Sequence, residues 1–340
     1  MKVIYENAGT AVYMGKAWGL LNELIEGQDV IIITDSNVGE LYGHNFPDCP
    51  VISIGTGETV KEMDTVLTII KHLLVSGADR SSFLLGIGGG VVCDITGFVA
   101  SVYMRGIPFG FVSTSLLSQV DASIGGKNGV NVNGIKNVIG CFNQPSFVIC
   151  DTSMLKTLPD EEFVSGLGEI VKHALIRDAE MFDLIEQNTS KLLAGENELL
   201  EELVSRSIAL KASVVEKDER EMGERRILNF GHTLGHAIES QTGMSHGISI
   251  SAGMMAAVGI SCDEGLLSSE EAGRIRSVME RLGLLPALEL QWPELGEKIL
   301  ADKKKKGENI FFILLEGIGK AKQVEFPLHE IIYRLSKNKS

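Results

Sequence analysis

The first half of the chain alternates short apolar runs with segments of helical periodicity, and this alternation constrains the fold more than any other feature. The runs typical of buried strands are Val30–Thr34, Phe83–Leu85, Phe109–Val112 and Phe147–Cys150. Between them, Thr59–Val75 and Val91–Val102 have the apolar spacing of helices. Strands that alternate with helices predict a mostly parallel sheet with helices on its faces.

After about Asp151 the pattern changes to helices. The segments with helical periodicity are Glu161–Leu175, Ala179–Gln187, Glu196–Val215, Thr233–Ser240, Ile250–Glu264 and Glu270–Leu282. Strand candidates are scarce before Ile310–Leu315. A chain of 340 residues is also long for a single core. We therefore predict an α/β Rossmann-like domain with a parallel sheet over residues 1–150, followed by a mainly α-helical domain over residues 151–340.

The charge and the cysteines narrow the possible partners and the compartment. A formal net charge of −14 argues against nucleic acid and anionic membranes as main partners. An acidic chain that binds an anion must gather its cations locally. Five cysteines without CxxC spacing, and an N-terminus without a signal-peptide pattern, predict a cytoplasmic protein. No apolar run approaches the ~18–20 residues that span a bilayer.

A segment rich in glycine, lysine and asparagine runs from Gly125 to Asn137. Glycines let the backbone approach a ligand closely, and lysine and asparagine side chains supply hydrogen-bond donors. We interpret the segment as a loop that binds an anionic, oxygen-rich small molecule. A polar surface loop is the alternative.

A second glycine cluster, Gly86–Val91, lies between a predicted strand and a predicted helix. In that position a dinucleotide pyrophosphate meets backbone N–H groups and a helix N-terminus. The fingerprint G-x-G-x-x-G fails, because its third glycine would fall on Val91. The cluster suits a phosphate, or it is a tight turn only. Asp35, at the end of the first strong strand, could bind a ribose hydroxyl or cap the next segment.

Acidic and basic side chains share one face of the helix predicted over Glu161–Leu175. Glu169, Lys172 and His173 are spaced i, i+3 and i+4. A solvated ion-pair face is one interpretation. The apolar neighbours of Glu169 place part of this face near the core and favour a functional role.

Three histidines follow within a short stretch. His232 and His236 are spaced i, i+4, as in helical zinc sites, and His246 comes soon after. Glu169 with two of these histidines would give three protein ligands and leave positions open for substrate, the pattern of a catalytic metal site. The spacing leaves open whether His232 pairs with His246 or with His236.

Taken together, the ordered blocks resemble the sugar-phosphate cyclases, and among them the 3-dehydroquinate synthases. The resemblance extends from about Asp35 to the region of Lys303. The matching segments are Gly88–Ala100, Tyr103–Gly106, Ser118–Lys127, Gly134–Gly140, Ser165–Lys172 and Leu228–Thr233. No single block is specific, but so many in the same order are.

The resemblance implies a reaction. These enzymes convert 3-deoxy-D-arabino-heptulosonate 7-phosphate to 3-dehydroquinate and phosphate in the shikimate pathway, which leads to chorismate and the aromatic amino acids. They use NAD and one divalent metal ion, Zn²⁺ or Co²⁺. Transient oxidation by NAD, phosphate elimination, reduction and aldol ring closure follow one another.

The resemblance also implies roles for residues toward the metal and the sugar phosphate. It makes Glu169, His232 and His246 the metal ligands and places His236 near the phosphate. The residues implied to face the phosphate are Lys127, Asn137, His236 and one of the pair Lys303 and Lys304, with Arg105 reaching in from the other subunit of a homodimer. Those implied for the carboxylate are Lys211, Arg225 and Asn229. Asp121 and Lys172 would contact ring hydroxyls. The implied catalytic set is Lys127, Asn137, Lys172, His236 and Asp121.

A larger set is implied to bind NAD. Its members are Asp35, Asn37, Glu58, Lys61, Gly89, Gly90, Val91, Val92, Cys93, Asp94, Thr114, Ser115, Lys136 and Thr157. The run Asp302–Gly307, which contains the phosphate-binding lysine, would otherwise be interpreted as a solvated loop.

Four positions depart from the usual residues of these enzymes. Cys93 stands where Gly is usual, in a turn beside the pyrophosphate, and could weaken NAD binding. Ile248 replaces the usual Glu after His246, and Glu224 stands where Leu is common. Ser115 replaces a Thr. None removes an implied ligand.

Three alternatives remain beside this assignment. Other cyclases tend to lose the Gly-Gly-Lys segment or the equivalents of Asn229 and His236, and all of these are present here. Metal-dependent alcohol and glycerol dehydrogenases share the two-domain layout, but they would release NADH. A non-catalytic NAD- or metal-binding protein would not need four cationic substrate contacts together with three metal ligands.

Overall fold

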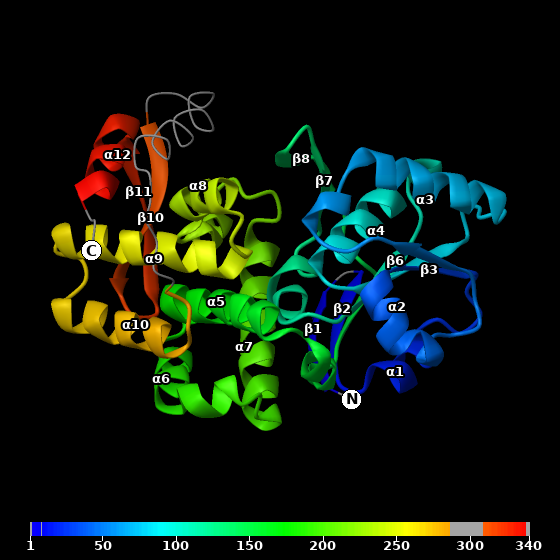
Figure 1. Cartoon of the computed structure of the whole chain (residues 1–340), viewed down its shortest axis with the longest axis horizontal. Helices are drawn as coiled ribbons and strands as arrows, with labels where there is room; N and C mark the ends of the chain where they lie inside the picture. Colours follow the sequence, from blue (N-terminus) through cyan, green and yellow to red (C-terminus); the bar gives the residue numbers. More distant parts are fainter. Residues whose placement is uncertain (1, 8, 286–308, 338–340) are drawn as a thin grey trace. The chain divides into compact units, whose positions relative to one another are not determined.

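The computed structural model describes residues 2–7, 9–285 and 309–337 (Figure 1). The chain divides into two compact units, Met1–Leu158 and Pro159–Ser340. The sequence pattern predicts a boundary after residue 150, and the structure divides the chain after Leu158. No helix among the described residues has the length and apolar character needed to cross a membrane.

The first unit is built on a seven-stranded sheet with the order β1-β2-β9-β6-β5-β3-β4. Its strands are β1 (Lys2–Asn7), β2 (Thr10–Met14), β3 (Val30–Asp35), β4 (Val51–Ile54), β5 (Phe83–Gly88), β6 (Phe109–Ser113) and β9 (Phe147–Cys150). Strands β1 and β2 pair antiparallel, and every other pair in the sheet is parallel. The predicted parallel sheet is confirmed. Its central strands are the four apolar runs, because a strand covered on both faces needs apolar side chains on both.

Helices and short helical turns connect these strands. The helices are α1 (Ala17–Leu24), α2 (Ser36–Tyr42), α3 (Met63–Val75) and α4 (Gly90–Val102). The turns are η1 (Gly43–Asn45), η2 (Glu58–Val60), η3 (Tyr103–Arg105), η4 (Ser118–Ala122) and η5 (Thr152–Thr157). Helix α4 follows β5 directly, so its N-terminus lies at the carboxyl end of the sheet, where α/β proteins bind ligands.

The glycine-, lysine- and asparagine-rich segment is not the predicted loop. It forms an antiparallel hairpin of β7 (Lys127–Val132) and β8 (Ile135–Phe142). The two connecting residues, Asn133 and Gly134, have φ of 51° and 75°. Two-residue hairpin turns of the type that matches strand twist require positive φ at both positions, and Asn-Gly suits it best. The alternative of a polar surface loop is wrong about the loop for the same reason, although residues 135–140 of β8 are exposed.

The second unit is mainly helical, as predicted. Its helices are α5 (Asp160–Arg177), α6 (Ala179–Leu193), α7 (Asn197–Lys217), α8 (His232–Thr242), α9 (His246–Asp263), α10 (Ser269–Arg281) and α12 (Leu328–Lys337), with the turn η6 (Glu224–Asn229). Strands β10 (Asn309–Gly317) and β11 (Lys320–Pro327) form an antiparallel hairpin. Helix α9, yellow in Figure 1, lies between α8 and α5 and contacts both.

Candidate functional site

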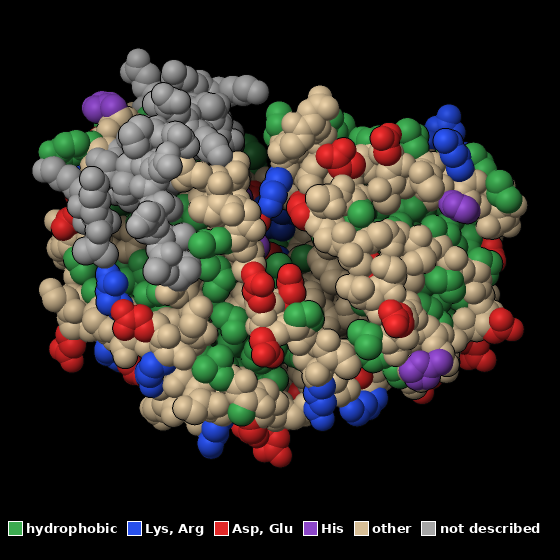
Figure 2. Space-filling view, in the orientation of Figure 1, with side chains coloured by type: hydrophobic (Ala, Val, Ile, Leu, Met, Phe, Trp, Pro, Cys, Tyr) green, Lys and Arg blue, Asp and Glu red, His purple; other side chains and the backbone are tan. Residues whose placement is uncertain are grey.

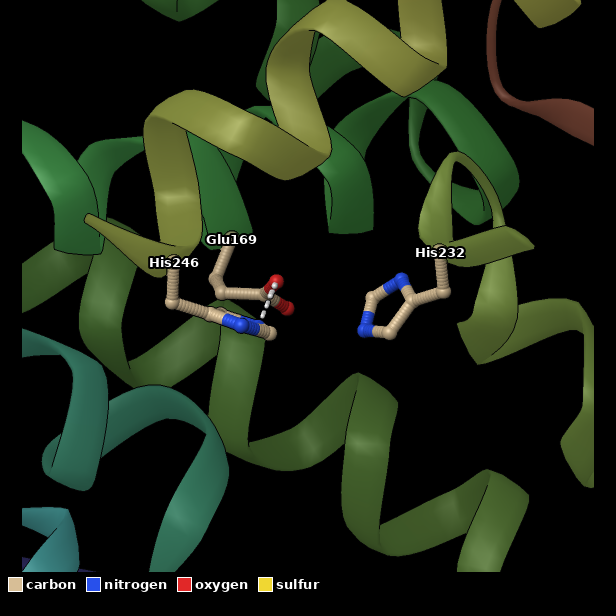
Figure 3. Close-up of side chains that lie close together, drawn as sticks. All are labelled: Glu169, His232 and His246. Atoms are coloured by element: carbon tan, nitrogen blue, oxygen red, sulfur yellow. Dashed lines mark ion pairs between the residues drawn. The ribbon is translucent and has the colours of Figure 1, made fainter. Parts of the chain in front are cut away.

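Three side chains that could hold a metal meet in the second unit. Glu169 lies within α5, while His232 and His246 are the first residues of α8 and α9. One donor atom from each lies within 4.8 Å of the other two. Figure 3 shows His232 facing Glu169 and His246 from the opposite side. Among the described residues, the group that contains Glu169 and two histidines uses His246, and His236 belongs to a separate group with Glu239 and His246.

The crossing of α5 and α9 brings Glu169 close to His246. A methyl group at Gly247 would overlap the backbone carbonyl of Ser165, and one at Gly168 would lie 2.9 Å from the carbonyl oxygen of Gly247. The backbone N–H of Gly247 also donates to Ser165 Oγ at 2.9 Å. Two helices approach this closely only where the side chain is a hydrogen atom. The carboxylate and the imidazole each adjoin one of these glycines, so the crossing fixes their separation.

A second glycine contact places His232. Gly231 precedes α8 with a left-handed φ of 79°, which turns the chain into the helix at low steric cost. A methyl group at Gly253 in α9 would overlap the carbonyl of Gly231, and one at Gly235 would lie 2.8 Å from Ile250 Cα. The first turn of α8 therefore rests directly on α9, and His232 starts from a fixed backbone position.

The carboxylate of Glu169 is held ionised although it is fully buried. Its side chain has 0% exposure and forms an ion pair with Lys172, which is 1% exposed. Burial by itself raises the pKa of Glu169, but Lys172 and the two histidines outweigh burial and hold that pKa well below its usual range. Neither oxygen has a hydrogen bond of normal geometry among the described residues. Oε2 faces the Lys172 ammonium, whereas Oε1 lies on the side of His246 and is available to a metal ion.

The two histidines present their Nε2 atoms to the same space. His232 Nδ1 lies 3.2 Å from the carbonyl oxygen of Phe230, and a carbonyl can only accept, so Nδ1 carries the proton. Burial and the charge of Lys172 hold the pKa of His232 well below its usual value. Burial also disfavours the charged form of His246, but Glu169 and Glu239 outweigh it and raise the pKa of His246 to about 9. Metal binding must displace that proton.

This donor set fits a divalent transition metal. Zn²⁺ and Co²⁺ take imidazole nitrogen and carboxylate oxygen, and three protein ligands with a free position are typical of catalytic sites. Oε1 of Glu169 gives an independent indication, because it is buried without a hydrogen bond among the described residues and buried polar atoms normally have partners. The residues present therefore fit a metal.

Other residues implied by the resemblance are also buried in the second unit. Lys211 on α7 is 6% exposed and Arg225 in η6 is 1% exposed, although such cations are rarely buried without partners. Arg225 Nη1 donates to the carbonyl oxygen of Glu219, and Asn229 Nδ2 donates to the carboxylate of Glu221. Glu221 has a left-handed φ of 58°. Glu221 was not predicted from the sequence, because a spacing of eight residues from Asn229 does not indicate a contact between the two side chains.

The ring of His236 lies beside the metal-ligand candidates without joining the group that contains Glu169. Its centroid is 5.1 Å from that of His232 and 6.0 Å from that of His246. Lys303 and Lys304, the implied phosphate ligands near the C-terminus, lie outside the described residues.

A polar network in the first unit joins residues for which the family resemblance implies different ligands. Lys61 forms an ion pair with Asp94 and donates to Asn137 Oδ1 at 2.6 Å. Asn131 accepts from the backbone N–H of Asn137 at 2.8 Å and donates to Glu58 Oε1 at 2.8 Å. Burial raises the pKa of Asp94, and Lys61 offsets only part of that rise. Lys61, which the resemblance implies for NAD, is therefore in direct contact with Asn137, which it implies for the phosphate.

The glycine cluster before α4 forms a tight turn. The residue before the helix is Gly89, where a methyl group would lie 3.2 Å from Ser115 Oγ, and one at Gly88 would lie 2.5 Å from Val92 Cβ. The backbone N–H of Thr114 donates to the carbonyl of Gly88 at 3.0 Å. The first N–H groups of a helix need partners from outside it, which an anion can supply.

The remaining implied residues lie on several elements of the first unit. Asp35 caps α2 by accepting from the backbone N–H of Val38 at 2.9 Å, which matches the capping alternative. Thr157 Oγ1 lies 2.6 Å from the hydroxyl of Tyr42. Asn37 belongs to α2, Arg105 to η3, Asp121 to η4, Lys127 to β7 and Lys136 to β8.

A few cations of this acidic chain are buried, while most others lie at least partly on the surface. On the face drawn in Figure 2, acidic and basic side chains of the described residues are interspersed. Among the residues that the structure describes, the buried cations are Lys61, Lys172, Lys211 and Arg225. Lys61 belongs to the first unit, and the other three belong to the second.

Family comparisons cover most of the chain. The model described as 3-dehydroquinate synthase N-terminal matches residues 51–165, and the one described as 3-dehydroquinate synthase C-terminal matches residues 166–305. The 3-dehydroquinate synthase of Nitrosospira multiformis is 42% identical over 319 residues, which cover 89% of this chain and 86% of that protein. The chain belongs to the 3-dehydroquinate synthase family.

Solved structures of related cyclases share the whole architecture. The 2-epi-5-epi-valiolone synthase from Streptomyces hygroscopicus subsp. jinggangensis 5008, with NAD⁺ and Zn²⁺ bound, is 28% identical with a TM-score of 0.88, covering 98% of this chain and 97% of that one. A 2-deoxy-scyllo-inosose synthase complexed with carbaglucose-6-phosphate, NAD⁺ and Co²⁺ is 25% identical with a TM-score of 0.87, covering 96% of both chains.

Cys93, which departs from the usual residue of 3-dehydroquinate synthases, is not in the turn. It lies inside α4 and is 1% exposed, and burial raises the pKa of its thiol. We expect iodoacetamide at about pH 8 to leave Cys93 unmodified in the folded protein, because a buried thiol is seldom a thiolate. Peptide mass spectrometry before and after denaturation would check this. Labelling of Cys93 in the folded protein at the rate of a free thiol would contradict it.

Glu224, another departure within the family, has basic partners. It forms an ion pair with Arg177, and Lys217 Nζ lies 3.7 Å from Glu224 Oε1. The Glu224 side chain is 36% exposed, and such pairs contribute about 0–1 kcal/mol. We therefore expect Glu224→Leu to change the free energy of unfolding by no more than about 1 kcal/mol in urea denaturation. A larger loss would mean that the pairing is a structural requirement.

Proposed function

We propose that the chain is a 3-dehydroquinate synthase, which converts 3-deoxy-D-arabino-heptulosonate 7-phosphate to 3-dehydroquinate and phosphate. The observation that carries the proposal is the group formed by Glu169, His232 and His246 in a chain of this family. The buried cations suit a substrate with a phosphate at one end and a carboxylate at the other.

We infer that the enzyme uses NAD and one divalent ion, Zn²⁺ or Co²⁺. The two related cyclases described above support this, since their structures contain NAD⁺ with Zn²⁺ or Co²⁺. Glu169, His232 and His246 would hold the ion. Bound together, these groups supply a lowered pKa for a coordinated hydroxyl and a reversible hydride acceptor.

The protein's own residues would bind and orient the sugar phosphate. In the first unit, Lys127 and Asn137 would donate hydrogen bonds to the phosphate, and Asp121 would accept one from a ring hydroxyl. The residues proposed for the same tasks in the second unit are His236 for the phosphate, Lys172 for a ring hydroxyl, and Lys211, Arg225 and Asn229 for the carboxylate. Lys172 also keeps Glu169 ionised, so that it is ready to act as a ligand.

The NAD contacts are proposed from the network around Lys61 and from the turn before α4. Lys61 and Glu58 offer a cation and a carboxylate to the cofactor's hydroxyls and phosphates. The N-terminus of α4 offers backbone N–H groups to the pyrophosphate. We also propose a cytoplasmic location, because none of the five cysteines forms a disulfide.

Arg105 leads us to propose a homodimer that shares its active sites. Met104 and Arg105 have φ of 50° and 71°, a conformation that costs about 1–3 kcal/mol at each non-glycine residue and that persists at functional positions. In this proposal Arg105 reaches the phosphate of the neighbouring subunit. We expect inactive Arg105→Ala and inactive Lys127→Ala proteins to recover partial activity when mixed, because one site in each mixed dimer keeps both residues. No recovery in verified heterodimers would contradict it.

Phosphate release from 3-deoxy-D-arabino-heptulosonate 7-phosphate tests the proposed function. Release that requires both NAD and Zn²⁺ or Co²⁺, without accumulation of NADH, is the expected result. Steady formation of NADH would indicate a metal-dependent alcohol or glycerol dehydrogenase instead. A protein that binds NAD and metal but does not act on this substrate would belong with cyclases of other sugar phosphates.

A further inference from the structure

A carboxylate outside the ligand group faces the far nitrogen of His246. His246 Nδ1 lies 3.4 Å from Glu239 Oε2, and its Nε2 lies 3.6 Å from Glu169 Oε1. Glu239 comes from α8, whereas His246 starts α9, so the contact joins two helices. Neither sequence periodicity nor the family resemblance singles out Glu239.

The contact with Glu239 determines which nitrogen of the His246 imidazole can bind a metal ion. An ionised carboxylate only accepts hydrogen bonds, so the nitrogen that faces Glu239 must carry the ring proton. When a metal ion displaces the second ring proton, the lone pair of His246 stands on Nε2, the atom on the side of Glu169. Metal-ligating histidines commonly donate their other N–H to a carboxylate or carbonyl, which fixes the tautomer and the ring orientation. His232 has the equivalent contact to the carbonyl of Phe230.

The position of Glu239 follows from the helix it belongs to. It lies seven residues after His232, so both project from the same face of α8. The Glu239 side chain is only 12% exposed, and a carboxylate withdrawn from water needs a hydrogen-bonding partner. Because Gly231, Gly235 and Gly253 hold α8 directly against α9, this carboxylate stays beside the first residue of α9.

We propose that Glu239 is a positioning residue for the metal centre, which holds the ring of His246 with Nε2 directed toward Glu169. The inference rests on the proposed function, because it requires a metal ion at Glu169, His232 and His246. In this proposal Glu239 touches neither the metal nor the substrate, but it sets the affinity of the site for the metal ion.

Zinc affinity of the metal-free protein, measured by competition with a chromophoric chelator, tests the proposal. We expect Glu239→Gln to weaken Zn²⁺ binding about 10- to 100-fold, the usual loss when such a partner is removed. Glu239→Asp keeps the negative charge but moves it away from His246, so its Zn²⁺ affinity should lie between those of the unaltered protein and Glu239→Gln. It also tests the proposal if Glu239→Gln does not fold. Glu280→Gln, which makes the same charge change at an exposed position of α10, should bind like the unaltered protein.

A spectroscopic measurement separates positioning from a general loss of structure. The visible absorption of Co²⁺-loaded protein reports ligand geometry, and it should shift in Glu239→Gln while remaining unchanged in Glu280→Gln. Equal Zn²⁺ affinity and equal spectra for Glu239→Gln and the unaltered protein would overturn the proposal. So would the loss of one of two bound ions, because Glu239 would then be a direct ligand of a second ion with His236.

The same experiment distinguishes failure of this inference from failure of the proposed function. Glu169→Ala should lose nearly all Zn²⁺ binding. If it binds Zn²⁺ as tightly as the unaltered protein, or if the unaltered protein binds none, the metal centre itself is wrong and the inference falls with it. If Glu169→Ala loses the metal and Glu239→Gln does not, only the role of Glu239 is refuted.

Discussion

Replacing His246 by alanine should abolish turnover and metal retention together. The variant removes one of three protein ligands and leaves Glu169 paired with Lys172 alone on that side of the site. A metal contributes several kcal/mol to the reactions it assists, so we expect phosphate release to fall about 10³-fold or more. Metal content by atomic absorption and phosphate release from the same sample would measure both effects.

The matched control is His329→Ala. His329 is exposed and lies in the same unit, so its loss removes an imidazole without disturbing the ligand group. It should retain both metal and activity. An active His246→Ala protein that contains no metal would contradict the metal centre altogether.

Replacing Gly247 by alanine should destabilise the second unit and disturb the metal site at the same time. The added methyl group would overlap the backbone carbonyl of Ser165, and backbone atoms cannot move aside as a flexible side chain can. Overpacking of this kind costs about 1–3 kcal/mol and sometimes more. We expect a loss of about 3 kcal/mol in the free energy of unfolding, measured by urea denaturation, with weaker Zn²⁺ binding in the folded fraction.

Gly273→Ala provides the comparison. Gly273 lies in α10 with nothing within 4 Å of the added methyl group and no positive φ. Alanine is favoured over glycine inside a helix by about 0.5–1 kcal/mol, so this variant should be as stable as the original chain or slightly more stable. A Gly247→Ala protein of unchanged stability would mean that α5 and α9 can separate without cost.

Local signals in the sequence predicted the elements that depend on them. The run Phe147–Cys150 is a strand with those bounds, and the apolar spacing of Val91–Val102 gave α4 to within one residue. The hairpin of β7 and β8 was missed although Asn133-Gly134 is the turn pair that best indicates one. Its strands carry polar side chains that resemble a loop. Strand β11, the edge strands β1 and β4, and β2 beside β1 were also missed, because these strands lack a continuous apolar run.

The residues of the candidate metal site could be predicted from the sequence only in part. The i, i+4 spacing of His232 and His236 is a local property of a helix, and by itself it allowed either histidine to join His232 and Glu169. The family resemblance, rather than spacing, pointed to His246. It could not point to Glu239, to Glu221 or to Ser165, since no local pattern marks a residue that acts by touching another helix.

The sequence by itself determined the central strands, the helices with a clear apolar period, the donor types available and the family to which the chain belongs, because these follow from side-chain chemistry and residue order. Only the tertiary structure decided which donors meet. The crossings at Gly247 and at Gly253 bring the starts of α8 and α9 to the middle of α5, and the position of one helix on another depends on surfaces far apart in the chain. Glu169, His232, His246 and Glu239 come together there because glycine lets three backbones approach where any larger residue would hold them apart.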